Sequence, residues 1–127
     1  MRKNLIAMLT VAAVSVGICV FSQIQIENAV DEMDKMRMEV MNLAENGDTK
    51  GAEAGLGRMA ERWIRYEGIL EMIAQHEQLQ EITELIIESD ANLTAEDSDD
   101  FRRSMHLLGE AIRHLMEEEK LKLTNVL

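Results

Sequence analysis

The chain begins with a long apolar stretch, Leu5 to Phe21, and no charged residue occurs between Lys3 and Glu27. As a helix that rises about 1.5 Å per residue, the uncharged stretch reaches roughly 34 Å, whereas the hydrocarbon core of a membrane is about 30 Å thick. The pattern therefore predicts a membrane-spanning helix at the start of the chain.

Beyond this stretch, helical periodicity continues from Gln23 to Asn46 without a helix breaker. The apolar positions of this stripe, which Arg37 interrupts, are Ile26, Val30, Met33, Val40 and Ala44. We therefore expect the spanning helix to continue into the first helix of the domain that follows. Asn46-Gly47 predicts its end, since Gly fits the left-handed position after a helix, and Asp48 can cap the next helix.

A second stripe has a change of phase. Its first part comprises Leu56, Met59, Ala60, Trp63, Leu70 and Ile73, and its second part follows in steps of three through His76, Leu79 and Ile82 to Leu85 and Ile86. A straight helix would rotate the second part away from the core. We therefore predict a kink or break near Ala74 to Glu77, and a third segment that ends near Asp90 to Asn92.

The last helix is predicted to begin at Thr94, which with Asp97 resembles a capping box. Its apolar residues alternate in steps of four and three: Phe101, Met105, Leu108, Ile112 and Leu115. That spacing is typical of the seam of an antiparallel bundle. The predicted fold is thus all-α, an N-terminal transmembrane helix that continues into a small antiparallel bundle of three to four helices.

We divide the chain into a membrane anchor, residues 1–26, and an acidic helical domain, residues 27–127. Arg2 and Lys3 precede the span, and positive charge before a first span predicts a cytoplasmic N-terminus. Residues 1–4 would then form a cytoplasmic tip. The expected location is the cell membrane, crossed once, with the C-terminal domain extracytoplasmic.

Two alternatives to an anchor stay open. A signal peptide could be cleaved at Val20-Phe21-Ser22, although this is a poor site and the apolar run is long for such a peptide. A lipoprotein could be lipidated at Cys19, although Ile18 stands where a small residue is needed. An anchor is the interpretation we prefer.

Composition and charge restrict the partners. The chain has a net charge of −11, and since its first charges are Arg2 and Lys3, the domain beyond the span carries −13. Nucleic acid is therefore not an expected partner, and flat binding to anionic lipid is disfavoured. Cys19 is the single cysteine, so no disulfide forms within the chain.

Three residues of the last helix, His106, Glu110 and His114, have the i, i+4, i+8 spacing that can hold a divalent metal. They fall opposite the seam that contains Leu108, where a solvated polar stripe is expected in any case. We therefore predict no metal or other cofactor, and keep this triad as the candidate of an alternative interpretation.

His76-Glu77 lies at the predicted break. It could be a pH-responsive pair, because histidine titrates near physiological pH. We expect a structural role instead, in which a buried His76 ring satisfies a backbone group left free by the break and packs beside Leu79. Acidification would then weaken the fold, since burial disfavours the charged ring.

The aromatic residues Trp63, Tyr66 and Phe101 are expected to be structural or interaction residues, with Trp63 and Phe101 in the core. The neighbouring basic row, Arg58, Arg62 and Arg65, is interpreted as a salt-bridged surface. The chain has no nucleophile–base–acid set and no glycine-rich phosphate loop after a strand. We therefore expect no enzyme and no catalytic residues.

Several features together resemble a family of small bacterial membrane proteins described as domain of unknown function 4363. They are a basic N-terminus before one span, a helix with Trp63, the pair His76-Glu77 followed by Leu79 and Ile82, and the ending Leu123 to Leu127. The resemblance implies a clostridia-like Gram-positive source and a single-pass membrane protein. Members are often encoded near a multi-span membrane protein, which implies a membrane partner.

The expected function is binding of another membrane or envelope protein by the helical domain, in a structural or regulatory accessory role. One alternative is a metal-dependent or pH-responsive sensor or enzyme that uses His106, Glu110, His114 or His76. Another is a purely structural spacer of the envelope. A homo-oligomer is compatible with the sequence, which identifies neither the partner nor the physiological signal.

Overall fold

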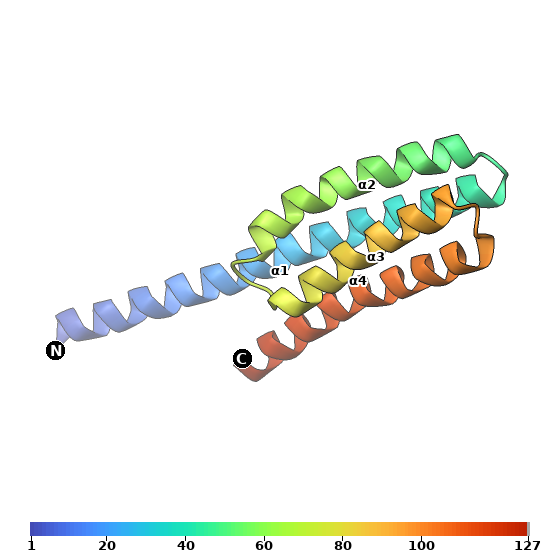
Figure 1. The fold of residues 1–127 in the computed structure, drawn as a ribbon. Coiled ribbons are helices and arrows are strands. Elements are labelled where there is room, and N and C mark those ends of the chain that lie inside the picture. Colours follow the sequence, from blue (N-terminus) through green and yellow to red (C-terminus); the bar gives the residue numbers. More distant parts are fainter. Residues whose placement is uncertain (127) are drawn as a thin grey trace.

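The structure, a computed structural model, describes residues 1–126. It contains four helices, α1 (Arg2–Glu45), α2 (Thr49–Leu70), α3 (His76–Thr94) and α4 (Ser98–Val126). They form an antiparallel bundle in which α1 packs against α2 and α4, and α3 packs against the same two helices from the other side (Figure 1). The predicted all-α bundle is confirmed, with four helices.

Helix α1 has two parts that form one unbroken helix. Its first part projects from the bundle (Figure 1), and the first buried residue is Ile26. The projecting part contains an 18-residue window with a mean hydropathy of 2.4, of which the rest of the protein buries 0%. By length and composition this helix can span a membrane, although a signal sequence has the same properties. The predicted continuity between the apolar stretch and the first bundle helix is confirmed.

The core consists of the apolar stripes predicted for the four helices. Phe101, Met105, Leu108, Ile112 and Leu115 of α4 are all buried, as are Ile26, Met33 and Val40 of α1. Leu79, Ile82 and Ile86 of α3 face them together with Leu56, Met59 and Trp63 of α2. Full burial of a side chain of this size contributes about 1.5–3 kcal/mol, so these stripes are the main source of the bundle's stability.

The turn between α1 and α2 has the predicted form. Gly47 adopts a φ of 80°, and its N–H donates to the carbonyl oxygen of Ala44 at 3.1 Å. The N–H of Asp48 donates to the carbonyl oxygen of Leu43 at 2.9 Å, which completes a Schellman motif. The carboxylate of Asp48 then accepts a hydrogen bond from the N–H of Gly51 at 2.9 Å and caps α2.

The predicted break between the second and third segments exists, but it lies earlier in the chain. Helix α2 ends at Leu70, and α3 begins at His76. The N–H groups of Ile73 and Ala74 both donate to the carbonyl oxygen of Leu70, at 3.0 and 2.8 Å. The chain therefore turns directly after Leu70, which stays fully buried. A change of phase shows that a break is needed, but it does not say on which side of Ile73 the break falls.

The predicted boundary between the last two helices is wrong. Thr94 is the final residue of α3 and does not begin α4, because α3 continues far enough to bury Leu93. Asp97 caps α4 instead, since its carboxylate accepts a hydrogen bond from the N–H of Asp100 at 3.1 Å. Glu96 occupies the left-handed position of this turn, with a φ of 57°. No glycine marks the position, so the usual sequence signal for the end of a helix is missing.

Candidate functional site

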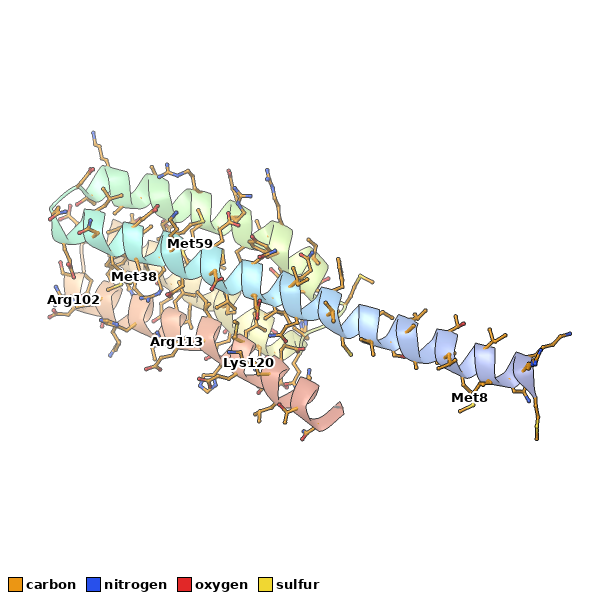
Figure 2. All side chains as sticks on the ribbon, turned by 180° about the vertical axis from the view of Figure 1, so that it is seen from behind. Met8, Met38, Met59, Arg102, Arg113 and Lys120 are labelled. Atoms are coloured by element: carbon orange, nitrogen blue, oxygen red, sulfur yellow. The ribbon has the colours of Figure 1, made fainter. Side chains whose placement is uncertain are left out.

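A pocket of about 480 Å³ lies at the end of the bundle opposite the projecting part of α1, which we call the distal end. All four helices and the α3–α4 turn contribute to it. Its apolar lining consists of Met41, Ala44, Leu93 and Phe101, and its polar lining of Glu45, Thr49, Asn92, Glu96, Asp97, Ser98 and Arg102. Figure 2 shows Arg102 at this end, far from Met8 on the projecting helix. The pocket therefore combines an apolar surface with a polar rim on which three carboxylates outnumber the single basic group of Arg102.

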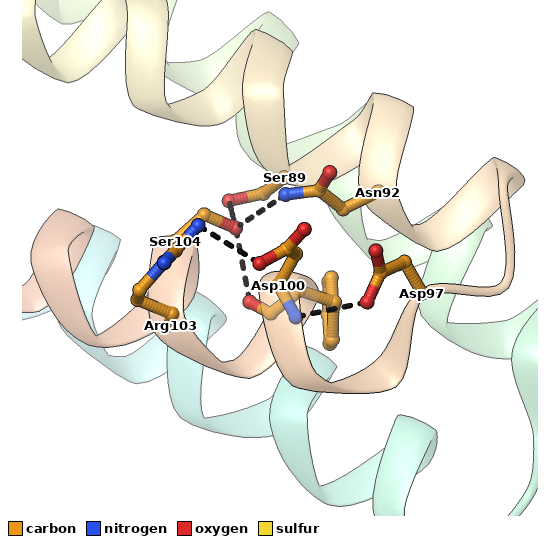
Figure 3. Close-up of polar contacts among 7 residues, drawn as sticks. Ser89, Asn92, Asp97, Asp100, Arg103 and Ser104 are labelled. Carbon is orange, nitrogen blue, oxygen red and sulfur yellow. Dashed lines mark hydrogen bonds and ion pairs between the residues drawn. The ribbon is translucent and has the colours of Figure 1, made fainter.

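The wall between α3 and α4 is fixed by a buried polar network (Figure 3). The hydroxyl of Ser89 donates to the hydroxyl of Ser104 at 2.9 Å, and Ser104 donates to the carbonyl oxygen of Phe101 at 2.9 Å. The side-chain amide of Asn92 also donates to Ser104, at 3.4 Å. Because these hydroxyls are paired, their burial carries no penalty for an unsatisfied group. The network holds Asn92 and Phe101 in place along the pocket.

Acidic groups gather where α4 begins beside the pocket. Hydrogen bonding with Asp97 and the repulsion of its charge raise the pKa of Asp100, and the opposing effect of Arg103 does not cancel them. Arg103 contacts the Asp100 carboxylate at 2.8 Å (Figure 3). Glu45 and Glu96 add two further carboxylates to the rim. A cationic group bound at this rim would reduce the mutual repulsion of these charges.

A buried arginine lies next to the pocket. Arg37 is only 5% exposed and is held by the Asp34 carboxylate at 2.9 Å and by the carbonyl oxygen of Met105 at 3.4 Å. One guanidinium N–H points at the sulfur of Met41, which lines the pocket, at 3.3 Å. The guanidinium fits beside α4 because residue 109 is a glycine. A Cβ added at Gly109 would lie 2.8 Å from the guanidinium carbon. Arg37 therefore joins α1 to α4 by its hydrogen bond to the Met105 carbonyl oxygen and by close packing against Gly109.

The sequence pattern showed Arg37 only as an interruption of an apolar stripe. A signal for its role was present, because Asp34 precedes it by one helical turn and Gly109 leaves a gap beside Leu108 in the α4 seam. Periodicity alone does not say that these positions on two distant helices meet. The contact between them was therefore missed.

Trp63 is a core residue, as expected, with 2% exposure. Its indole N–H donates to the hydroxyl of Thr83 on α3 at 2.8 Å, and Thr83 is also within hydrogen-bonding distance of Glu67, at 3.2 Å. These contacts join α2 to α3 and leave no ring face free for a ligand. Phe101 is likewise buried, with 6% exposure, and its position beside the pocket gives it a second role as pocket lining.

Tyr66 joins α2 to α1. Its hydroxyl donates to the carboxylate of Glu32, which also pairs with Arg62 at 3.0 Å. Burial raises the pKa of Tyr66 to about 12, helped by the hydrogen bond and the charge of Glu32 and opposed by Arg62. Of the predicted basic row, Arg62 therefore has the expected ion pair.

The metal candidates His106, Glu110 and His114 are all exposed on α4, on the face away from the bundle core. His114 lies 3.8 Å from Glu117, its neighbour along the helix. Within residues 1–126, no group of three or more histidine, cysteine or acidic side chains is arranged to hold a metal ion. The structure thus gives no support to a sensor or enzyme built on these three residues.

The buried, structural position expected for His76 is wrong. His76 and Glu77 are both exposed at the start of α3. The reason is the earlier break, which places His76 in the first turn of α3 while Leu79 begins its buried face. The ring is not buried, so the reason for expecting a loss of stability on acidification no longer applies.

The fold and this pocket define a helical bundle carried on a long apolar N-terminal helix. The chain belongs to the family described as Domain of unknown function (DUF4363), whose sequence model matches residues 20–126. The family was identified correctly from the sequence. Searches of curated proteins and of solved structures gave no match.

Proposed function

We propose that the protein is a single-pass membrane protein of a bacterial envelope whose bundle binds another membrane or envelope protein at the distal pocket. The observation that carries the proposal is the pocket itself, about 480 Å³ in volume, with an apolar lining and an acidic rim. Such a surface suits a partner segment that combines an apolar side chain with a basic one. The proposed role is binding, without catalysis by the chain.

The orientation is part of the proposal. Arg2 and Lys3 favour a cytoplasmic N-terminus, so the bundle would lie outside the membrane. Because α1 continues without a break from Arg2 to Glu45, it would hold the bundle at a fixed distance from the bilayer. Protease added outside intact cells should then remove the region beyond Glu27. Complete protection until lysis, in cells whose envelope admits the protease, would refute the orientation.

The binding site is tested by co-purification from detergent-solubilised membranes of cells that express the chain, followed by mass spectrometry. Ala44→Trp places a large side chain in the pocket, and Glu45→Lys with Glu96→Lys reverses the charge of its rim. A matched control reverses Glu53 and Glu61, two exposed residues of α2 away from the pocket. We expect both pocket variants to lose a protein that the control retains. Equal recovery with all variants would refute the site.

A further inference from the structure

We call the end of the bundle from which α1 projects the proximal end. It carries two exposed apolar side chains on different elements. Met72, in the α2–α3 turn, is 86% exposed, and Leu121, on the last part of α4, is 64% exposed. Figure 1 shows that the α2–α3 turn and the end of α4 both lie on the side where α1 leaves the bundle. Both residues therefore lie at the end of the bundle from which the proposed span emerges.

Contacts between the helices give the level of Met72 along α1. Tyr66 of α2 bonds to Glu32 of α1, and the two helices are antiparallel. Met72 follows Tyr66 by six residues, so it lies close to the level of Ile26, six residues before Glu32. Ile26 is the last residue of the uncharged stretch that begins after Lys3.

The same argument gives the level of Leu121. Arg37 of α1 contacts α4 at Met105 and Gly109, so it is level with the middle of that segment, near residue 107. Leu121 lies fourteen residues beyond residue 107. Because α1 and α4 run antiparallel, Leu121 is level with the residue fourteen positions before Arg37, which is Gln23. Two independent helix contacts thus place Met72 and Leu121 at nearly the same depth, at the end of the uncharged stretch.

We propose that Met72 and Leu121 contact the lipid bilayer at the boundary between headgroups and acyl chains, and so seat the bundle upright on the membrane. This rests on the proposed span, because the depth is measured along α1. Lys120 and Lys122 flank Leu121, and Figure 2 shows Lys120 toward the proximal end. The ammonium group of Lys122 pairs with the Glu119 carboxylate at 3.2 Å. The aliphatic stem of Lys120 can follow the apolar surface while its ammonium group reaches lipid phosphates.

The charges around these residues limit how deep the contact goes. Glu71 precedes Met72, Glu77 lies on the next helix, and Glu117, Glu118 and Glu119 precede Lys120. Carboxylates are costly inside hydrocarbon, so the proximal end stays at the interface and does not insert. This contact is made by the end of the bundle and is compatible with the weak tendency of its acidic sides to lie flat on anionic lipid.

The proposal is tested with spin labels on the full chain in phosphatidylcholine nanodiscs. Cys19→Ser removes the native thiol, and single cysteines are then introduced by Met72→Cys or Leu121→Cys. The matched control is Ile87→Cys, because Ile87 is 63% exposed on α3 and lies roughly 16 Å farther from the membrane than His76. Phe21→Cys reports on the span itself. The measurement is accessibility to lipid-soluble oxygen relative to a water-soluble nickel chelate.

We expect the oxygen-to-nickel ratio to be severalfold higher at positions 72 and 121 than at position 87. Equal ratios at 72, 121 and 87, with position 21 protected, would refute the lipid contact and leave the span intact. A label at position 21 that the nickel chelate reaches freely would refute the span, and the contact with it. Lipids with a photoreactive group near the headgroup provide a check that needs no substitution or spin label in the protein. They should modify Met72 in the unaltered chain and spare Ile87.

Discussion

Replacement of Gly109 by alanine tests the buried contact between α1 and α4. An added Cβ would lie 2.8 Å from Cζ, 2.9 Å from Nε and 3.1 Å from Nη2 of Arg37. These atoms cannot move away easily, since the guanidinium is held between the Asp34 carboxylate and the Met105 carbonyl oxygen. The substitution should therefore displace a buried charge.

The expected magnitude is a balance of two effects. In a helix interior, alanine is more stable than glycine by about 1 kcal/mol, whereas overpacking of a filled site costs about 1–3 kcal/mol. Displacement of the guanidinium also weakens its pairing with Asp34. We expect Gly109→Ala to lower the free energy of unfolding by about 1–2 kcal/mol, a loss of roughly 4–8 °C in melting temperature for each kcal/mol.

The assay is thermal unfolding of the full chain in detergent, followed by the fluorescence of Trp63, the single tryptophan. Gly57→Ala is the control, because a Cβ there meets no atom within 4 Å. It should stabilise the bundle by about 1 kcal/mol.

A second control removes the arginine. Arg37→Met removes the guanidinium. Asp34 then loses its partner, but 38% of its side chain is exposed to solvent. Because the Asp34 side chain is partly exposed, water can solvate its carboxylate when the guanidinium is removed, so no buried charge is left unpaired. In this background Gly109→Ala should become stabilising. If Gly109→Ala stabilises the chain that retains Arg37 as much as Gly57→Ala does, the described packing of Arg37 is wrong.

Four further predictions concern single contacts. Trp63→Ala should cost about 3–5 kcal/mol, and an unchanged melting curve would place the ring on the surface. Tyr66, the single tyrosine, should ionise near pH 12 in an absorbance titration, and Glu32→Gln should lower that pKa. The contribution of Tyr66 to the stability of the fold is therefore complete below pH 10.0 and is lost as the pH rises toward about 12. Ionisation near pH 10.0 in the native chain would refute the contact between Tyr66 and Glu32. In chemical unfolding, Gly47→Ala should lower the free energy of unfolding by about 1 kcal/mol and Glu96→Gly should raise it by up to about 1 kcal/mol, because both residues adopt positive φ. Changes of the opposite sign would contradict the turn geometry. His76→Gln should change stability by less than about 0.5 kcal/mol from pH 5 to pH 8 because the side chain is exposed, and a larger, pH-dependent loss would restore a structural role.

Periodicity predicted most of the fold because burial repeats along each helix. The steps from Phe101 to Leu115 identified the buried face of α4, and Gly47 identified the end of α1. The end of α3 was missed because Glu96 takes the left-handed position that glycine usually marks. The break before His76 was placed about three residues late, since a change of phase does not define which residue turns.

The distal pocket could not be predicted from any one helix. Its lining joins Met41 of α1 and Thr49 of α2 to Leu93 of α3 and Arg102 of α4. These positions meet only because two turns lie at the same end of the bundle. Local patterns describe each turn, but the space between them depends on how the helices pack.

Photo-crosslinking in intact cells tests the central claim that an anchored bundle binds a partner at its distal end. A photoreactive residue replaces Thr49 on the pocket rim or, as the control, Ile64, which is exposed on α2. We predict one discrete protein adduct from position 49, none from position 64, and loss of the adduct in Ala44→Trp. Absence of an adduct from position 49, or the same adduct from both positions, would contradict the proposed site.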